Sequence, residues 1–133
     1  MTTKLFCIAL LAAASMCAEM TQRLIVQIPF GFHVGNAMLP PGEYTVDTDA
    51  GTHLVRLRSA DWKSGVMILT NAVQTSARPS VGNLIFTKYG DDYFLYRIWQ
   101  AGNDTGNELN KSRREREVAA NSRRGAQTIV ASK

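Results

Sequence analysis

The segment from Leu84 to Trp99 constrains the fold of this chain most, because it holds two aromatic-rich runs separated by Gly90-Asp91. Aromatic and β-branched side chains favour a pleated, half-buried sheet, and glycine at the first position of a two-residue loop favours a type II′ turn. The segment is therefore predicted to be a β-hairpin. Two strands alone are only marginally stable in water, so further strands must pack on them.

The register of this hairpin depends on the length of its loop. A two-residue loop gives the pairs Tyr89–Asp92, Phe86–Leu95 and Leu84–Arg97. A three-residue loop would instead gather five apolar residues on one face, namely Leu84, Phe86, Phe94, Tyr96 and Ile98. A shift of one residue exchanges the two faces of a strand. With either loop, one face is apolar enough for a core and the other carries aromatic residues that need partial cover.

The start of the chain has the pattern of a secretory signal peptide. Lys4 is followed by an apolar run from Leu5 to Ala14 and by small residues that end at Ala18. This run is shorter than the about 20 apolar residues that a membrane span needs. Residues 1–18 are therefore predicted to be a signal peptide cleaved after Ala18, with Ala14 as the alternative, and the protein is expected in the periplasm or the extracellular space. A buried N-terminal helix and a lipid anchor on Cys17 are weaker alternatives.

Both cysteines of the chain, Cys7 and Cys17, lie inside this predicted signal peptide. The mature chain would then be cysteine-free, with no disulfide, thiolate metal site or catalytic thiol. About 115 residues would remain, which is enough for one domain with its own core. No transmembrane span is expected in this mature chain.

Residues 19–110 are predicted to form the folded domain, because short strand patterns alternate with turn signals and show no helical period. The expected strands ahead of the hairpin are 24–28, 30–34, 42–46, 53–58 and 65–73. The last of these is apolar and branched enough to be a buried strand. The pattern predicts a mostly-β fold: a single antiparallel β-sandwich or flattened barrel of about seven strands with a short C-terminal α-helix.

Residues 111–133 are predicted to form a basic C-terminal helix and tail. Ser112 and Glu115 have the spacing of a capping box, in which each side chain accepts a hydrogen bond from the other's backbone N–H. The helix is expected from Glu115 to Ser122, with Leu109 as its anchor. Residues 128–130 would add an edge strand or fray, and deletion of residues 123–133 is expected to leave the thermal midpoint nearly unchanged.

Positive charge is concentrated in the same tail. Residues 111–133 carry seven basic and two acidic residues, whereas residues 19–110 carry seven basic and nine acidic ones. Basic tails can bind nucleic acid or acidic polymers, but a solvated helix face with pairs such as Arg113–Glu117 is the simpler interpretation. Because export removes most nucleic acid from reach, nucleic acid is not an expected partner.

The residues that could carry chemistry are few. His33 and His53 lie in different expected strands without the spacing of a metal site, although Asp47 or Asp49 could supplement them. Both are expected to be ordinary strand or turn residues. There is no GxSxG motif, and two adjacent carboxylates at the hairpin turn cannot face a substrate from two sides. We therefore expect no enzyme activity, no cofactor and no metal.

Aromatic residues supply the best candidate contact surface. Core filling is the favoured interpretation of these residues, but the hairpin has more of them than one face can bury, so they are also the candidate for a surface that stacks on sugars or peptides. Its residues are Trp62, Tyr89, Tyr93, Tyr96 and Trp99. A filled core with Trp62 and Trp99 exposed would favour an interaction module. A cavity lined by Phe30, Phe32, Phe86 and Phe94 would favour a carrier.

Several sequence pieces give the chain a resemblance to a known group. These pieces are Ile28-Pro29-Phe30-Gly31-Phe32-His33-Val34-Gly35, Leu39-Pro40-Pro41-Gly42-Glu43-Tyr44-Thr45-Val46, Phe86, Lys88-Tyr89-Gly90, Tyr93-Phe94-Leu95, Ile98-Trp99, Gly102, Gly106, Glu108-Leu109, Lys111-Ser112, Glu115 and Glu117. With these pieces, the chain resembles a group of small uncharacterised exported proteins of soil bacteria. The resemblance implies export and transfers no site, because no activity is established for the group.

Together these observations predict an exported, non-catalytic binding or interaction module of the periplasm or cell surface. Its expected partner is an envelope protein or a polysaccharide. The alternative is a carrier that holds a small apolar ligand between its sheets. A hydrolase is the least favoured class.

Overall fold

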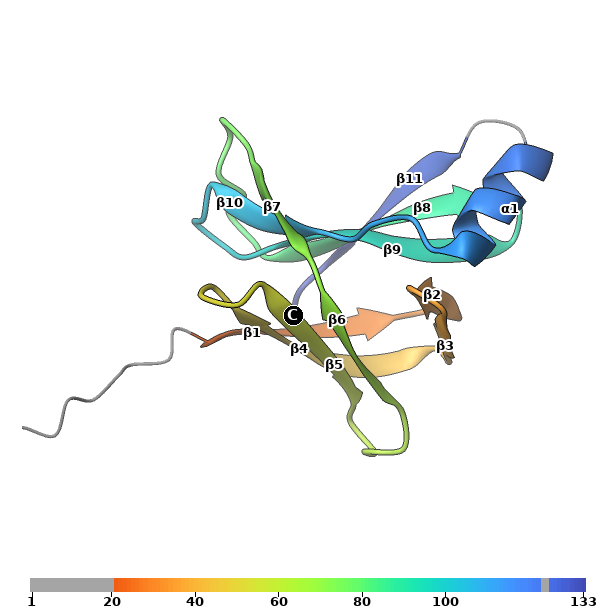
Figure 1. Cartoon of the computed structure of the whole chain (residues 1–133). Helices are drawn as coiled ribbons and strands as arrows, with labels where there is room; N and C mark the ends of the chain where they lie inside the picture. The colour runs from red at the N-terminus through yellow and green to blue at the C-terminus, as the bar shows by residue number, and fades with distance from the viewer. Residues whose placement is uncertain (1–20, 123–124) are drawn as a thin grey trace, which may run out of the picture.

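A computed structural model of the chain describes residues 21–122 and 125–133, which form a mostly-β fold of two sheets and one short helix (Figure 1). Sheet A consists of β1 (Thr21–Ile28), β4 (Gly42–Asp49), β5 (Leu54–Ser59) and β6 (Gly65–Leu69), in that order. Sheet B consists of β11 (Ala126–Ala131), β8 (Asn83–Tyr89), β9 (Asp92–Trp99), β10 (Thr105–Glu108) and β7 (Asn71–Gln74), in that order. A hairpin joins sheet B beside β9 and consists of β2 (Phe32–Val34) and β3 (Ala37–Leu39).

The predicted fold class is confirmed, and the described residues form an open sandwich rather than a closed barrel. All strand pairs are antiparallel except the single pair between β2 and β9. The expected signal peptide, residues 1–18, lies outside the described residues. Within residues 21–122 and 125–133, no helix is long and apolar enough to cross a membrane.

The segment 65–73 was expected to be one buried strand, and this expectation is wrong. β6 ends at Leu69, the chain turns at Thr70, and β7 continues in the other sheet (Figure 1). At this corner Thr70 donates hydrogen bonds from its N–H and its hydroxyl to the carbonyl of His53, at 3.0 and 2.7 Å. Both strands are sheet edges; β6 exposes every second side chain, and β7 exposes three of its four residues. An apolar run alone does not distinguish an edge strand from a buried one.

The C-terminal residues pack against both sheets. β11 pairs with β8 over six residues, so residues 128–130 belong to a strand. The N–H of Ser132 donates to the carbonyl of Gly82 at 2.8 Å, and the N–H of Lys133 donates to that of Ile25 at 2.9 Å. The chain end therefore fastens sheet B to the β1 edge of sheet A (Figure 1). This arrangement contradicts the expectation that deleting residues 123–133 has little effect.

The hairpin has the two-residue loop, with Tyr89 paired with Asp92. The first loop residue, Gly90, has a φ of 59°. The second, Asp91, does not have a positive φ, since among the described non-glycine residues only His53 and Trp62 do. A type II′ turn requires a positive φ at its first central residue only. Further along, a β-bulge next to Phe86 shifts the register by one residue. Leu84 is consequently opposite Ile98, and the predicted pairing with Arg97 is wrong. The bulge lets both apolar residues point into the core.

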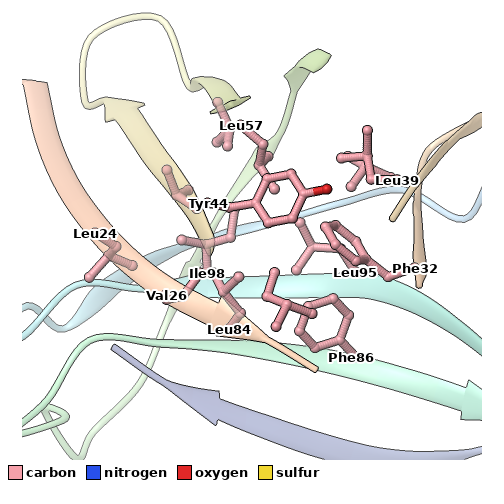
Figure 2. Packing of buried hydrophobic residues seen from close by; sticks show 14 of the residues in the cluster. Leu24, Val26, Phe32, Leu39, Tyr44, Leu57, Leu84, Phe86, Leu95 and Ile98 are labelled. Carbon is pink, nitrogen blue, oxygen red and sulfur yellow. The ribbon is translucent and has the colours of Figure 1, made fainter. Parts of the chain in front are cut away.

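The core lies between the sheets and is filled by side chains that touch (Figure 2). The ring of Phe86 packs edge-on against Phe30 and Phe32, with centroid distances of 5.0 and 5.4 Å. Phe32 packs in the same way on Tyr44 at 5.2 Å. The buried Tyr44 hydroxyl donates a hydrogen bond to the carbonyl of Pro40. Edge-to-face contacts of this kind stabilise a core beyond the area that they bury.

Helix α1 (Arg113–Asn121) covers one end of sheet B (Figure 1). Leu109 is buried in the core cluster just before the helix, and Arg113 pairs with Glu117 at 3.3 Å, as predicted. The Ser112 hydroxyl accepts a hydrogen bond from the N–H of Glu115 at 3.1 Å. Only this half of the capping box forms. The Glu115 carboxylate instead accepts a hydrogen bond from the Tyr89 hydroxyl at 3.4 Å. It does so because the Glu115 side chain is buried between the helix and sheet B.

This buried carboxylate makes stability depend on pH. Burial raises the pKa of Glu115, with the charge of Lys111 and the Tyr89 hydrogen bond acting in the opposite direction. A raised folded-state pKa gives stability that is fully present below the ordinary glutamate pKa of about 4.3 and is lost as pH rises through the folded value. Glu115→Gln should therefore gain stability relative to the wild type between pH 4 and pH 7 in urea unfolding. Glu117→Gln, at an exposed position, is the control, and parallel pH curves for all three proteins would contradict the assignment.

Candidate interaction surface

The five aromatic residues predicted as a contact surface do not lie together. Tyr89 and Trp99 are buried, each with 6% of its surface exposed. Tyr93 and Tyr96 are half-buried in β9. Trp62 alone among the five is widely exposed, at 71%, and it lies in the loop between β5 and β6 of the other sheet. Of the two tryptophans expected to be exposed, only Trp62 is.

Contacts on the outer face of sheet B explain why the hairpin aromatics are covered. Gly106 of β10 lies directly on the indole of Trp99, since a Cβ atom at this glycine would be 2.6 Å from the ring atom Cε3. Phe94 lies beneath His33, with ring centroids 4.4 Å apart. Tyr89 is covered by helix α1 through Glu115. Strand β10 thus supplies part of this cover.

The histidines occupy separate places. His33 lies in β2, with its Nε2 atom 3.7 Å from Oδ1 of Asp92 at the hairpin turn. His53 lies in the turn between β4 and β5, has a φ of 58°, and donates its N–H to the carbonyl of Asp49 at 2.9 Å. Within the described ranges, no three His, Cys, Asp or Glu side chains are grouped so that they could hold a metal ion.

The space between the sheets offers little to an apolar ligand. Phe32 and Phe86 are fully buried there and in direct ring contact, and Phe30 packs on Phe86. Phe94 is buried on the outer face of sheet B beneath His33 and does not line this space. A groove of about 280 Å³ opens at the other end of the sandwich, but amide and hydroxyl groups line much of it. There the amide of Gln100 donates to the hydroxyl of Thr48 at 3.2 Å. The filled core therefore favours an interaction module over a carrier.

The most exposed apolar residues of sheet A lie on its edge strand β6. Met67 and Leu69 are 55% and 68% exposed, and the sequence of β6 contains no charged residue. Native sheets usually protect such an edge with lysine, proline or a bulge. The opposite edge of sheet A, β1, carries Arg23 and is closed by the C-terminal residues. Among the described strands of sheet A, β6 is thus the edge left open and apolar.

The hydrogen-bond pattern shows which backbone groups of β6 face outward. The N–H of Thr70 donates to the carbonyl of His53, and the N–H of Ser59 donates to that of Ser64. In an antiparallel pair, the backbone N–H and C=O groups of successive residues point alternately toward the partner strand and away from it. Val66 and Ile68 therefore bond to β5. The N–H and C=O groups that point to the open edge are those of Gly65, Met67 and Leu69.

The loop next to this edge holds Trp62 in an unusual conformation. Trp62 has a φ of 64°, which is costly for a bulky residue. Its N–H donates to the carbonyl of Ser59 at 3.0 Å, and the Asp61 carboxylate accepts from the Ser59 hydroxyl at 2.6 Å and from the N–H of Lys63 at 3.0 Å. The hydrogen bonds to its carboxylate lower the pKa of Asp61, and the bond from the Ser59 hydroxyl has the largest effect. The turn thus holds an exposed indole in a strained position, as binding sites often do.

Two arginines lie next to the same edge. Arg56 and Arg58 lie on the outer face of β5, directly opposite Met67 and Gly65. The guanidinium carbon of Arg58 lies 3.7 Å from the ring centroid of Trp62, a cation–π contact. We call the group of Arg58, Trp62, Gly65, Met67 and Leu69 the β6 surface.

No protein-family model, no curated protein and no solved structure matches this chain. Its class is therefore defined by its own architecture: an open antiparallel β-sandwich with a filled core and one exposed apolar edge strand.

Proposed function

We propose that this protein is an exported, non-catalytic interaction module of the periplasm or cell surface, and that it binds its partner along the β6 surface. One observation carries the proposal: on the edge strand β6, Met67 and Leu69 have both exposed apolar side chains and backbone N–H and C=O groups that point away from β5. An extended segment of a partner can add to such an edge through backbone hydrogen bonds. An envelope protein therefore fits this surface better than a polysaccharide, which has no strand to pair.

Export is part of the proposal and is supported by sequence alone. Residues 1–18 have the order of charge, apolar run and small residues that signal peptides share. The resemblance to small exported proteins of soil bacteria agrees with this pattern.

Capture from a bacterial envelope fraction tests the proposed surface. The immobilised wild type should retain a protein that the double variant Met67→Glu/Leu69→Glu loses by at least about tenfold, because charged side chains on an edge oppose strand pairing. Ile129→Glu is the matched control, since Ile129 is an exposed apolar residue, at 65%, on the edge strand β11. Thermal unfolding verifies that each variant folds. Equal capture by the double variant and the control would overturn the proposal.

A further inference from the structure

We infer that the partner of the β6 surface is an extended strand that places an acidic side chain opposite Gly65. This inference rests on the proposed function and adds to it the chemistry of the partner.

Gly65 leaves a gap in the row of side chains across the outer face of sheet A. Its direct neighbour in β5 is Arg58, and it has no side chain to separate Arg58 from a strand added beyond β6. The hollow over this gap has a volume of about 360 Å³ and is lined by Arg56, Leu57, Arg58, Gly65, Val66 and Met67. An acidic side chain on the added strand would enter this hollow and meet the guanidinium group.

The carboxylates near this hollow already have other partners. Asp47 binds Arg23 at 2.8 Å, and Asp61 is held by the loop that contains Trp62. Among the described residues, neither Arg56 nor Arg58 takes part in an ion pair. The ring of Trp62 holds the Arg58 guanidinium in place, so less side-chain entropy is lost when a carboxylate binds.

A second copy of the chain would complement this surface poorly. If two β6 edges paired, the residue opposite Gly65 would come from the outward set Gly65, Met67 and Leu69. None of these offers Arg58 a carboxylate, since Gly65 and Leu69 have no side-chain acceptor and the thioether of Met67 is only a weak one. An acidic strand of a partner would supply both the backbone hydrogen bonds to β6 and a carboxylate for Arg58.

Fluorescence anisotropy with two labelled synthetic peptides tests this inference. The acidic probe is Thr-Val-Glu-Val-Glu-Val-Thr, with blocked ends, and the basic probe has lysine in place of both glutamates. Alternation puts the glutamates on one face of the added strand and the valines on the other. The wild type should bind the acidic probe at least tenfold more tightly than the basic probe at low salt, and less strongly at high salt.

Two variants test the charge of Arg58 and the backbone pairing of β6 separately. Arg58→Glu should reverse the preference between the probes, while Lys88→Glu, an equal charge change on sheet B, should keep it. Met67→Pro removes one outward N–H but none of the bonds to β5, so it should abolish binding of both probes while the fold remains. If Met67→Pro fails to fold, the Arg58→Glu reversal still decides the question.

Three results would overturn the inference. They are equal affinity for both probes, no binding of the acidic probe at millimolar concentration, and sedimentation of the wild type as a dimer that Met67→Pro dissociates. The last would identify a second copy as the partner. If these tests fail but the double glutamate variant still loses its envelope protein, the acidic strand is wrong and the proposed function stands.

Discussion

Truncation after Ser122 is expected to lower the free energy of unfolding by about 3–5 kcal/mol. The truncation removes β11, which pairs with β8 over six residues, and both hydrogen bonds from Ser132 and Lys133. Each backbone hydrogen bond contributes about 1 kcal/mol net and the half-buried Val130 roughly another, but the conformational entropy that residues 126–133 lose on folding offsets part of this sum. The loss would also leave β8 as an uncovered apolar edge.

Urea and thermal unfolding of the truncated chain measure this effect. The thermal midpoint should fall by about 10–20 °C. A shorter truncation that removes only Ser132 and Lys133 is the control and should produce a small part of the loss, since β11 itself remains. A midpoint unchanged after removal of residues 123–133 would show that the β11–β8 pairing contributes little in solution.

Phe86→Ala is expected to destabilise the protein by about 3–5 kcal/mol, the usual cost of removing a large buried aromatic ring. Phe86 is fully buried and packs edge-on against Phe30 and Phe32 from other parts of the chain. The alanine variant would leave a cavity that these rings can only partly fill.

Two further variants place this loss in context. Phe86→Leu keeps most of the volume and should cost clearly less than the alanine variant. Trp62→Ala removes a ring of similar size from an exposed position, so the free energy of unfolding should change by no more than about 0.5 kcal/mol. If Phe86→Ala behaves like Trp62→Ala, the core between the sheets is not packed as described.

Local signals in the sequence predicted the hairpin but left the length of its loop open. Glycine at the first loop position favours the two-residue loop that the structure has, and the pair Tyr89–Asp92 follows from that loop. The bulge next to Phe86 has no such signal, because its cause lies in the need of Leu84 and Ile98 to face one core. A register that depends on packing between distant strands cannot be derived from either strand alone.

Long-range pairing also explains the errors in the tail and in the segment 65–73. The β-branched residues 128–130 left an edge strand and a frayed end equally open, and they form a strand because β8 offers them an edge. The turn at Thr70 depends on hydrogen bonds to His53, which is distant in the sequence.

The candidate surface was predicted only in part. Of the five aromatic residues proposed from the sequence, only Trp62 is widely exposed. Tyr89 and Trp99 were misassigned because their cover comes from Glu115 and Gly106, which pair with them only in the folded chain. The outward backbone groups of β6 have no sequence signal, since they depend on which edge of sheet A stays open.

Residue-resolved amide hydrogen exchange tests the central claim most directly. In the free protein, the amides of Met67 and Leu69 should exchange fast, whereas those of Val66 and Ile68 should be protected by their bonds to β5. When the acidic probe or the captured envelope protein binds, exchange at Met67 and Leu69 should slow by at least about tenfold, because an added strand accepts their hydrogen bonds. Protection of Met67 and Leu69 already in the free monomer, or exchange that stays fast in the complex, would contradict the assignment of β6 as the binding edge.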